Sequence, residues 1–253
     1  MRAEGGLASV AVRAAAASAA IACALLPAGV GSAAAEVELA PLVAGGAIAP
    51  GWRFAGLPRQ KFPPTDYRAV RIDGLDALRI EARGSYGNLV HELPAGARLG
   101  TLAWRWRLER PNPRADLATR PGDDSAAKVC VLFDAPIEQV PFVERQLLRV
   151  ARAASGEALP AATLCYVWAH AQRAGDVVPN AYSKRVRYVV LRGSEAPLDT
   201  WLDERRDVAA DFLRAFGDEA REVPPASAVA VAGDADNTGA HSVAFVADLR
   251  AKR

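Results

Sequence analysis

Short segments in which apolar and polar residues alternate recur along most of this 253-residue chain. In the clearest of them, residues 102–108 (LAWRWRL), leucine and tryptophan occupy one set of alternate positions and alanine and arginine the other. A period of two places successive side chains on opposite faces of a strand, so one face can be buried. Further apolar runs of strand length lie at residues 78–82, 129–133, 164–168, 186–190, 229–231 and 243–249. With Pro- and Gly-bearing turns between them, these runs predict an all-β fold, a jelly-roll-like β-sandwich.

Two segments follow a helical period instead. In residues 137–154, apolar side chains recur at Val140, Val143, Leu147 and Val150. This spacing is typical of an amphipathic helix that turns its apolar stripe toward the core. Residues 203–216 have the same period, and Gly217 follows where a C-terminal cap belongs. We therefore expect two short helices inserted into the sandwich.

The first 35 residues have the pattern of a secretory signal peptide. Arg2 and Arg13 supply positive charge, residues 14–26 are apolar, and small residues at 33–35 precede Glu36. The apolar stretch is shorter than the roughly 20 residues that span a bilayer. We expect cleavage near Ala35, a periplasmic or secreted protein, and one sandwich domain over residues 36–253. The alternative is a lipoprotein anchored at Cys23, although residues 20–23 match that motif loosely.

Charge and hydropathy limit the classes of partner that this chain is expected to bind. Without residues 1–35, the chain keeps 29 of its 31 basic and 28 of its 29 acidic side chains. This balance argues against nucleic acid or an anionic membrane as the main partner. No other apolar stretch approaches spanning length, so we expect a chain that does not span a membrane.

Two cysteines remain after residue 35, Cys130 and Cys165, and both lie in strand-like runs. In an oxidising compartment they can form a disulfide, which would stabilise the fold by about 4 kcal/mol on the chain-entropy model. Alternatively, they are two buried thiols on neighbouring strands. The chain has no CxxC motif and no close histidine pair, which disfavours a cysteine–histidine metal site.

Several motifs, taken in order, resemble one bacterial family. They are residues 104–106 (WRW), 122–124 (GDD), 128–134 (KVCVLFD), 166–168 (YVW), Asn180, Trp201, 204–208 (ERRDV), 211–212 (DF), 216–217 (FG) and 234–239 (DADNTG). The family is catalogued as domain of unknown function 3047, and the resemblance covers residues 52–249. It implies a secreted or envelope protein of Gram-negative bacteria without an established activity. By analogy of fold alone, the layout is similar to the jelly-roll sandwiches of carbohydrate-binding modules.

The closing segment, residues 226–249, has two apolar runs around a polar tip, which predicts a β-hairpin. In the tip, Asp234, Asp236 and Asn237 have the spacing of oxygen ligands in a calcium loop. A closing glutamate is absent from residues 241–248. The tip is therefore either a calcium site that uses Asp234 and Asp236, or an Asx-rich turn in which Gly239 is left-handed.

A second acidic pair, Asp123 and Asp124, precedes a predicted strand. Carboxylates at such a position can bind a metal or act as general acid and base. Because neighbouring residues on extended backbone face opposite ways, we expect one aspartate to be structural and the other exposed at a loop rim. Lys128 lies near enough in the sequence to neutralise one of them. If this rim meets the 234–237 tip, at least one carboxyl pKa should rise.

Aromatic side chains offer a third candidate site. Trp168 with Tyr182, beside Asn180, is the best local match to a sugar-binding groove. The alternative for Trp168 is the core, where Trp104 and Trp106 belong because they share the parity of neighbouring leucines.

Signatures of known catalytic motifs are absent, among them GxSxG, HExxH and a Gly-rich phosphate loop. We therefore assign no catalytic residue, and the sequence leans away from an enzyme without deciding the question. The leading hypothesis is a periplasmic binding module for a carbohydrate or another envelope component. One alternative is a glycan hydrolase or lyase that uses Asp123 or Asp124 with Asp234 or Asp236. Another is an envelope assembly protein.

Overall fold

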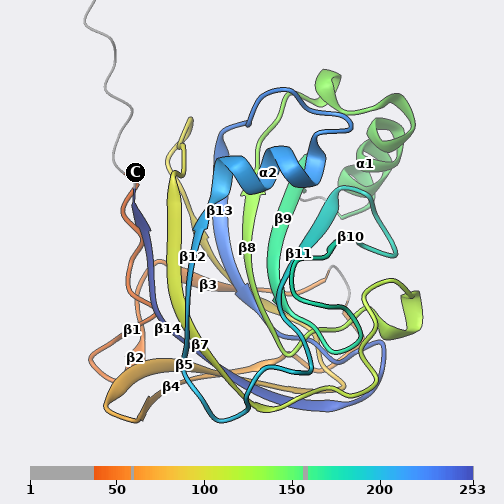
Figure 1. Cartoon of the computed structure of the whole chain (residues 1–253). Helices are drawn as coiled ribbons and strands as arrows, with labels where there is room; N and C mark the ends of the chain where they lie inside the picture. The colour runs from red at the N-terminus through yellow and green to blue at the C-terminus, as the bar shows by residue number, and fades with distance from the viewer. Residues whose placement is uncertain (1–36, 58–59, 156–158, 253) are drawn as a thin grey trace, which may run out of the picture. The chain divides into compact units, whose positions relative to one another are not determined.

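The structure, a computed structural model, describes residues 37–252 apart from 58–59 and 156–158. The predicted signal peptide, its cleavage near Ala35 and Cys23 lie outside the described residues. Strands dominate the fold and form two large sheets that face each other (Figure 1). Among the described residues, no helix is long and apolar enough to cross a membrane.

The larger sheet has seven strands in the order β10-β11-β9-β8-β13-β6-β3. Their bounds are β3 Trp52–Ala55, β6 Asn88–Glu92, β8 Ala127–Phe133, β9 Ala162–Trp168, β10 Val177–Pro179, β11 Val186–Arg192 and β13 Ala226–Ala232. Neighbouring strands are antiparallel except β9 and β11, which are parallel.

The smaller sheet has five antiparallel strands in the order β12-β7-β14-β5-β4. Their bounds are β4 Asp66–Ile72, β5 Leu75–Arg83, β7 Thr101–Arg110, β12 Leu202–Asp207 and β14 His241–Lys252. A separate pair, β1 Val43–Ala44 and β2 Ala47–Ile48, forms a short hairpin.

The core lies between the inner faces of the two sheets. Trp104 and Trp106 of β7 are buried there, as their parity predicts. The Trp104 ring lies 5.3 Å from the ring of Tyr166, and the Trp106 ring lies 5.6 Å from the ring of Trp168. These contacts join β7 of one sheet to β9 of the other. The predicted all-β sandwich with two short helices is thereby confirmed.

Helix α2, Val208–Phe216, is shorter than predicted. The Asp207 side chain caps it by accepting a hydrogen bond from the Ala210 N–H. Residues 203–207, expected to be helical, instead belong to edge strand β12 and pair with β7. Exposed and half-buried side chains alternate along β12, which is the period of a strand. Gly217 follows the helix with φ −65°, so it does not form a left-handed cap.

Helix α1, Phe142–Ser155, begins after a 3₁₀ turn at Ile137–Gln139. The predicted inward stripe is wrong. Val143, Leu147 and Val150 point to solvent, whereas Leu148 is buried against the sandwich. Val140 is also buried, but it precedes the helix. Spacing showed that an apolar stripe exists and could not show which side of the helix meets the sheets.

The predicted closing hairpin is also wrong. Strand β13 pairs with β6 and β8 in the larger sheet, whereas β14 pairs with β5 and β7 in the smaller one. Residues 233–240 therefore cross from one sheet to the other, and we call them the inter-sheet loop. Each strand is central in its own sheet and needs two neighbours. A true two-residue hairpin lies elsewhere, where Asp73 and Gly74, both at positive φ, join β4 to β5.

Candidate functional site

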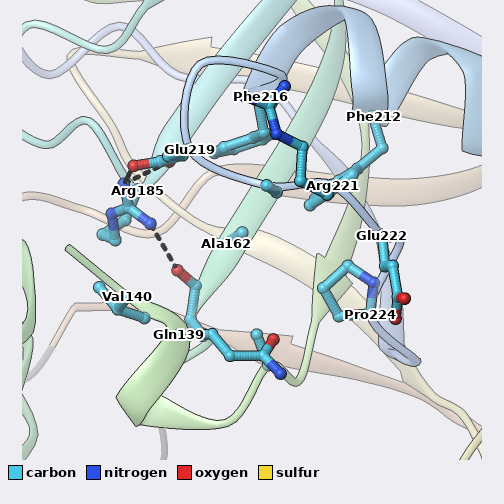
Figure 2. A pocket seen from close by; sticks show the side chains of 13 residues that line it. Gln139, Val140, Ala162, Arg185, Phe212, Phe216, Glu219, Arg221, Glu222 and Pro224 are labelled. Carbon is cyan, nitrogen blue, oxygen red and sulfur yellow. Dashed lines mark hydrogen bonds and ion pairs between the residues drawn. The ribbon is translucent and has the colours of Figure 1, made fainter.

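Strand β8 has a cluster of polar residues at each end. Near its C-terminal end, a cavity of about 480 Å³ opens between α2 and the residues after β8 (Figure 2). Its lining includes Val140, Phe212 and Phe216. The Arg185 side chain in its wall donates to both carboxylate oxygens of Glu219, at 2.5 and 2.6 Å. Because this buried guanidinium is matched by a carboxylate of the same chain, the cavity presents no unbalanced buried charge.

At the other end of β8, the two acidic loops meet. Strands β8 and β13 are antiparallel neighbours, with Ala232 opposite Lys128. The residues that follow β13 therefore lie beside the residues that precede β8. The backbone confirms the contact, since the Asp234 N–H donates to the Ser125 carbonyl at 2.9 Å. The register thus brings together acids that are 110 residues apart in the sequence.

Asp124 fastens the inter-sheet loop. It has no solvent-exposed surface, and four donors surround its carboxylate. Oδ1 accepts from the backbone N–H and the side-chain Nδ2 of Asn237, both at 3.2 Å. Oδ2 accepts from the backbone N–H of Thr238 at 2.8 Å and from its hydroxyl at 2.6 Å. A carboxylate offers about four lone-pair positions, so this one is fully used.

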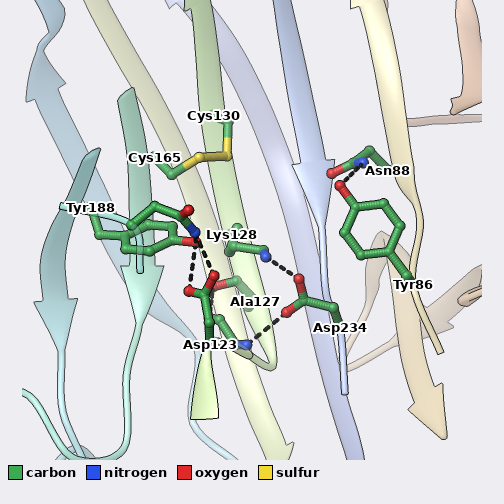
Figure 3. Close-up of a disulfide and its surroundings, with 11 residues drawn as sticks. Tyr86, Asn88, Asp123, Ala127, Lys128, Cys130, Cys165, Tyr188 and Asp234 are labelled. Atoms are coloured by element: carbon green, nitrogen blue, oxygen red, sulfur yellow. Dashed lines mark hydrogen bonds and ion pairs between the residues drawn. A yellow bond between two sulfur atoms is a disulfide. The ribbon is translucent and has the colours of Figure 1, made fainter. Parts of the chain in front are cut away.

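Asp234 forms a buried ion pair with Lys128 (Figure 3). Its other oxygen accepts the Ser125 N–H at 2.7 Å. Burial raises the pKa of Asp234 to about 6, and Lys128 opposes this rise. Burial alone would lower the pKa of Lys128, but Asp234 holds it well above its usual value. Lys128 therefore neutralises Asp234, whereas the sequence suggested Asp123 or Asp124.

Asp123 is buried as well, so the prediction of an exposed aspartate at this rim is wrong for both residues. A 3₁₀ turn at residues 120–122 precedes it and gives Asp123 a ψ of 61°, which interrupts the extended backbone. Its carboxylate accepts the Tyr188 hydroxyl at 3.0 Å and the Asn180 side-chain amide. Burial raises the pKa of Asp123, against the effects of Lys128 and Tyr188.

Asn180 links the buried Asp123 carboxylate to the segment that carries Tyr182. Its Oδ1 accepts the backbone N–H groups of Tyr182 and Ser183, each at 2.9 Å. The Tyr182 hydroxyl lies 2.7 Å from Asn237 Oδ1, to which it can donate its proton. The Tyr182 side chain is nonetheless exposed, with 55% of its surface open to solvent. An exposed aromatic ring is thus held at a defined position beside the inter-sheet loop.

Asp236 is the acid of this cluster that stays half-buried. Its Oδ1 is covered and lacks a hydrogen-bond partner among the described residues. Burial, followed by the charge of Asp124, raises the pKa of Asp236. The expected upward shift therefore occurs, with burial as its first cause.

The calcium prediction can be tested against the donors present. Oxygens of Asp124, Asp234 and Asp236 lie within 4.8 Å of one another, close enough for one cation. However, donors occupy all of the Asp124 lone pairs, and Asp234 contacts the Lys128 ammonium. A calcium ion needs six to eight free oxygen ligands, so this donor set does not fit it. Of the two interpretations of the tip, the turn with Gly239 at φ +62° agrees with the geometry.

The structure brings together seven of the eight predicted ligand residues, leaving out Trp168. They are Asp123, Asp124, Asn180, Tyr182, Asp234, Asp236 and Asn237. The Trp168 ring lies in the core because it shares the inward parity of Leu164 and Tyr166 on β9. Sequence reasoning missed Tyr188, which no local motif marks, and did not assign a role to Thr238 of the 234–239 motif.

The cysteines lie on the same face as Lys128. Cys130 of β8 is directly opposite Cys165 of β9, and a disulfide joins them (Figure 3). Their side chains share the parity of Lys128 and alternate with the core valines Val129 and Val131. The disulfide therefore ties the strands on the face of the larger sheet turned away from the core.

These features define a two-sheet β-sandwich with an ordered polar cluster at one end. The sequence matches the family described as "Protein of unknown function (DUF3047)" over residues 50–250, so the chain belongs to this family. No curated protein matches the chain.

Two solved structures show limited similarity. One is a family 11 carbohydrate-binding module from Clostridium thermocellum in complex with a β-1,3-1,4-mixed-linked tetrasaccharide, with 10% identity, a TM-score of 0.41, and coverage of 87% of this chain and 96% of that chain. The other is the K2 cleaved adhesin domain of Lys-gingipain, with 10% identity, a TM-score of 0.36, and coverage of 87% and 100%. At these scores neither structure informs the ligand of this chain.

Proposed function

We propose that this protein is a periplasmic or secreted binding module. Its ligand is a carbohydrate or another hydroxyl-rich envelope component, bound at the rim formed by Tyr182, Asp236 and Asn237. One observation carries the proposal: an exposed tyrosine ring is held by a hydrogen bond to Asn237, the residue that follows the half-buried Asp236. The Cys130–Cys165 disulfide supports an oxidising compartment.

This rim suits a sugar for a physical reason. An aromatic face packs against the C–H face of a sugar ring, while carboxylate and amide oxygens accept its hydroxyl protons. Exposed aromatic side chains usually lose rotamer freedom when a ligand binds. Here the Asn180 and Asn237 contacts restrict Tyr182 beforehand, so less ordering remains to oppose binding.

The same contacts favour binding over the hydrolase or lyase alternative. Glycoside hydrolysis generally needs two carboxyl groups that both reach the substrate. Asp124 and Asp234 are fully buried and hydrogen-bonded, and Asp123 is engaged by Asn180 and Tyr188. This leaves Asp236 as the accessible acid of the cluster.

Titration calorimetry against a panel of bacterial polysaccharides and peptidoglycan fragments tests the proposal. For a ligand that binds, we expect Tyr182→Ala and Asp236→Asn each to weaken affinity about tenfold or more, in line with the loss of an anchoring contact. Phe142→Ala and Asp203→Asn are matched controls, because both residues are exposed and lie outside the cluster. Heat signals that both rim variants leave unchanged would refute the rim as the site.

A further inference from the structure

Arg120 adjoins the rim and is held beside Tyr182 by three contacts. Its Nε donates to the Ala181 carbonyl at 3.2 Å, and its guanidinium carbon lies 5.3 Å from the centre of the Tyr182 ring. The Tyr182 hydroxyl in turn lies 3.1 Å from the Arg120 carbonyl oxygen and 2.7 Å from Asn237 Oδ1. Arg120 and Tyr182 are both exposed. This end of the sandwich therefore presents a guanidinium whose position is fixed relative to the tyrosine ring.

The Arg120 charge has no counter-charge within the described part of the chain. Its side chain contacts the backbone and the tyrosine ring, and no carboxylate there pairs with it. Asp123 and Asp124 follow closely in the sequence, but other donors already bind their carboxylates. Asp234 is paired with Lys128. The contacts of the described residues thus leave both Nη groups of Arg120 able to donate to a ligand.

An uncompensated guanidinium beside an exposed aromatic ring favours one ligand chemistry. Its parallel N–H groups match the two oxygens of a carboxylate, and such charge-assisted pairs are stronger than neutral hydrogen bonds. A hexuronate combines both features, because its sugar ring can pack against Tyr182 while its carboxylate accepts from Arg120. Its hydroxyls then donate to Asn237 and Asp236, since the Asp236 carboxylate repels an acid group. One guanidinium near several carboxylates suits a singly charged carboxylate better than a phosphate.

We infer that the rim binds a saccharide that carries a carboxylate, and that Arg120 determines this specificity. The ligand class is a hexuronate rather than a neutral sugar. The inference rests on the proposed function, to which it adds the chemical class of the ligand and a further contact residue. A neutral sugar gains little from the guanidinium charge, so the preference of the protein for an acid over its neutral counterpart measures the contribution of Arg120.

Titration calorimetry with matched ligands tests the inference. The probes are oligomers of galacturonate, glucuronate and mannuronate, each compared with its own methyl ester, which keeps the sugar and removes the charge. We expect at least one free acid to bind wild type about tenfold more tightly than its ester, and to bind more weakly as salt rises. Arg120→Gln should remove this preference, whereas Arg120→Lys, which keeps the charge without the planar fork, should retain part of it. Arg149→Gln, which removes an exposed arginine of α1, is the matched control and should leave both affinities unchanged.

The comparison of acid and ester on wild type needs no variant, so poor folding of Arg120→Gln would not affect it. Equal binding of acid and ester, weakened together by Tyr182→Ala, would overturn the inference and leave the proposed function standing. An acid preference that a folded Arg120→Gln variant keeps would overturn it as well, as would tighter binding of a sugar phosphate or silence of every hexuronate. Saccharide affinities that Tyr182→Ala and Asp236→Asn both leave unchanged would instead refute the rim itself.

Discussion

The inter-sheet loop buries polar side chains, whereas α1 exposes apolar ones. In the loop, buried polar groups are almost fully satisfied, as the four donors around Asp124 illustrate. On α1, large apolar groups face solvent and one leucine, Leu148, holds the helix down. Hydrogen bonds and ion pairs offset the desolvation cost of buried polar groups. Large exposed apolar patches, by contrast, often mark surfaces that contact a partner. Most acids of the cluster therefore build the scaffold, whereas α1 leaves large apolar side chains exposed to solvent.

The largest effect should come from breaking the Lys128–Asp234 pair. Lys128→Met leaves the Asp234 carboxylate buried without its partner, so we expect a loss of about 3–5 kcal/mol in the free energy of unfolding. Urea denaturation measures this loss. The double variant Lys128→Met/Asp234→Leu should recover much of it, because no charge remains buried. A single variant as stable as wild type would show that the pair does not organise the loop.

Asp124→Asn should come next. The new amide nitrogen would face N–H or O–H donors that Asp124 now accepts, so we expect destabilisation of about 2–3 kcal/mol. Hydrogen exchange at the Asn237 and Thr238 amides should accelerate in this variant. Unchanged protection there would contradict the fastening role of Asp124.

The two neighbouring leucines of α1 provide an internal test of its orientation. Leu148→Ala should cost about 2 kcal/mol because it empties a buried contact. Leu147→Ala, at an exposed position, should change the unfolding free energy by less than about 0.5 kcal/mol. Thermal or urea unfolding of both variants decides the matter. The reverse order would mean that the predicted inward stripe is the true packing face.

The smallest effect concerns pH. Arg79, with His241 and Arg83, lowers the pKa of Glu81 to about 2, below its value in the unfolded chain. An acid with a lowered folded pKa stabilises above the unfolded pKa, and this stability is lost as pH falls through the folded value. Because Arg83 is exposed, we expect only about 1 kcal/mol. The stability difference between wild type and Glu81→Gln should therefore shrink from pH 7 to pH 2. A constant difference would contradict this.

Most polar residues of the cluster could be identified from the sequence, but the structural role of each residue could not. Asp123, Asp124, Asp234 and Asn237 were recognisable as candidates because oxygen-rich turns are conspicuous. Their role as scaffold depends on Lys128, Tyr188 and Thr238. Each partner lies far along the sequence from the aspartate that it contacts, so no local sequence pattern predicts the pairing. Trp168 shows the same limit, because the identity of an aromatic residue does not tell whether it lies in the core or lines a groove.

The sequence by itself determined seven of the strands, the presence of a helix before Gly217 and the family, because period and motif order are local properties. Tertiary structure alone decided that β13 and β14 join different sheets, that the acidic loops meet, and that α1 turns its apolar stripe outward. An alternating pattern specifies which face of a strand is buried and leaves its neighbours open. Those neighbours are chosen by the packing of the whole sandwich.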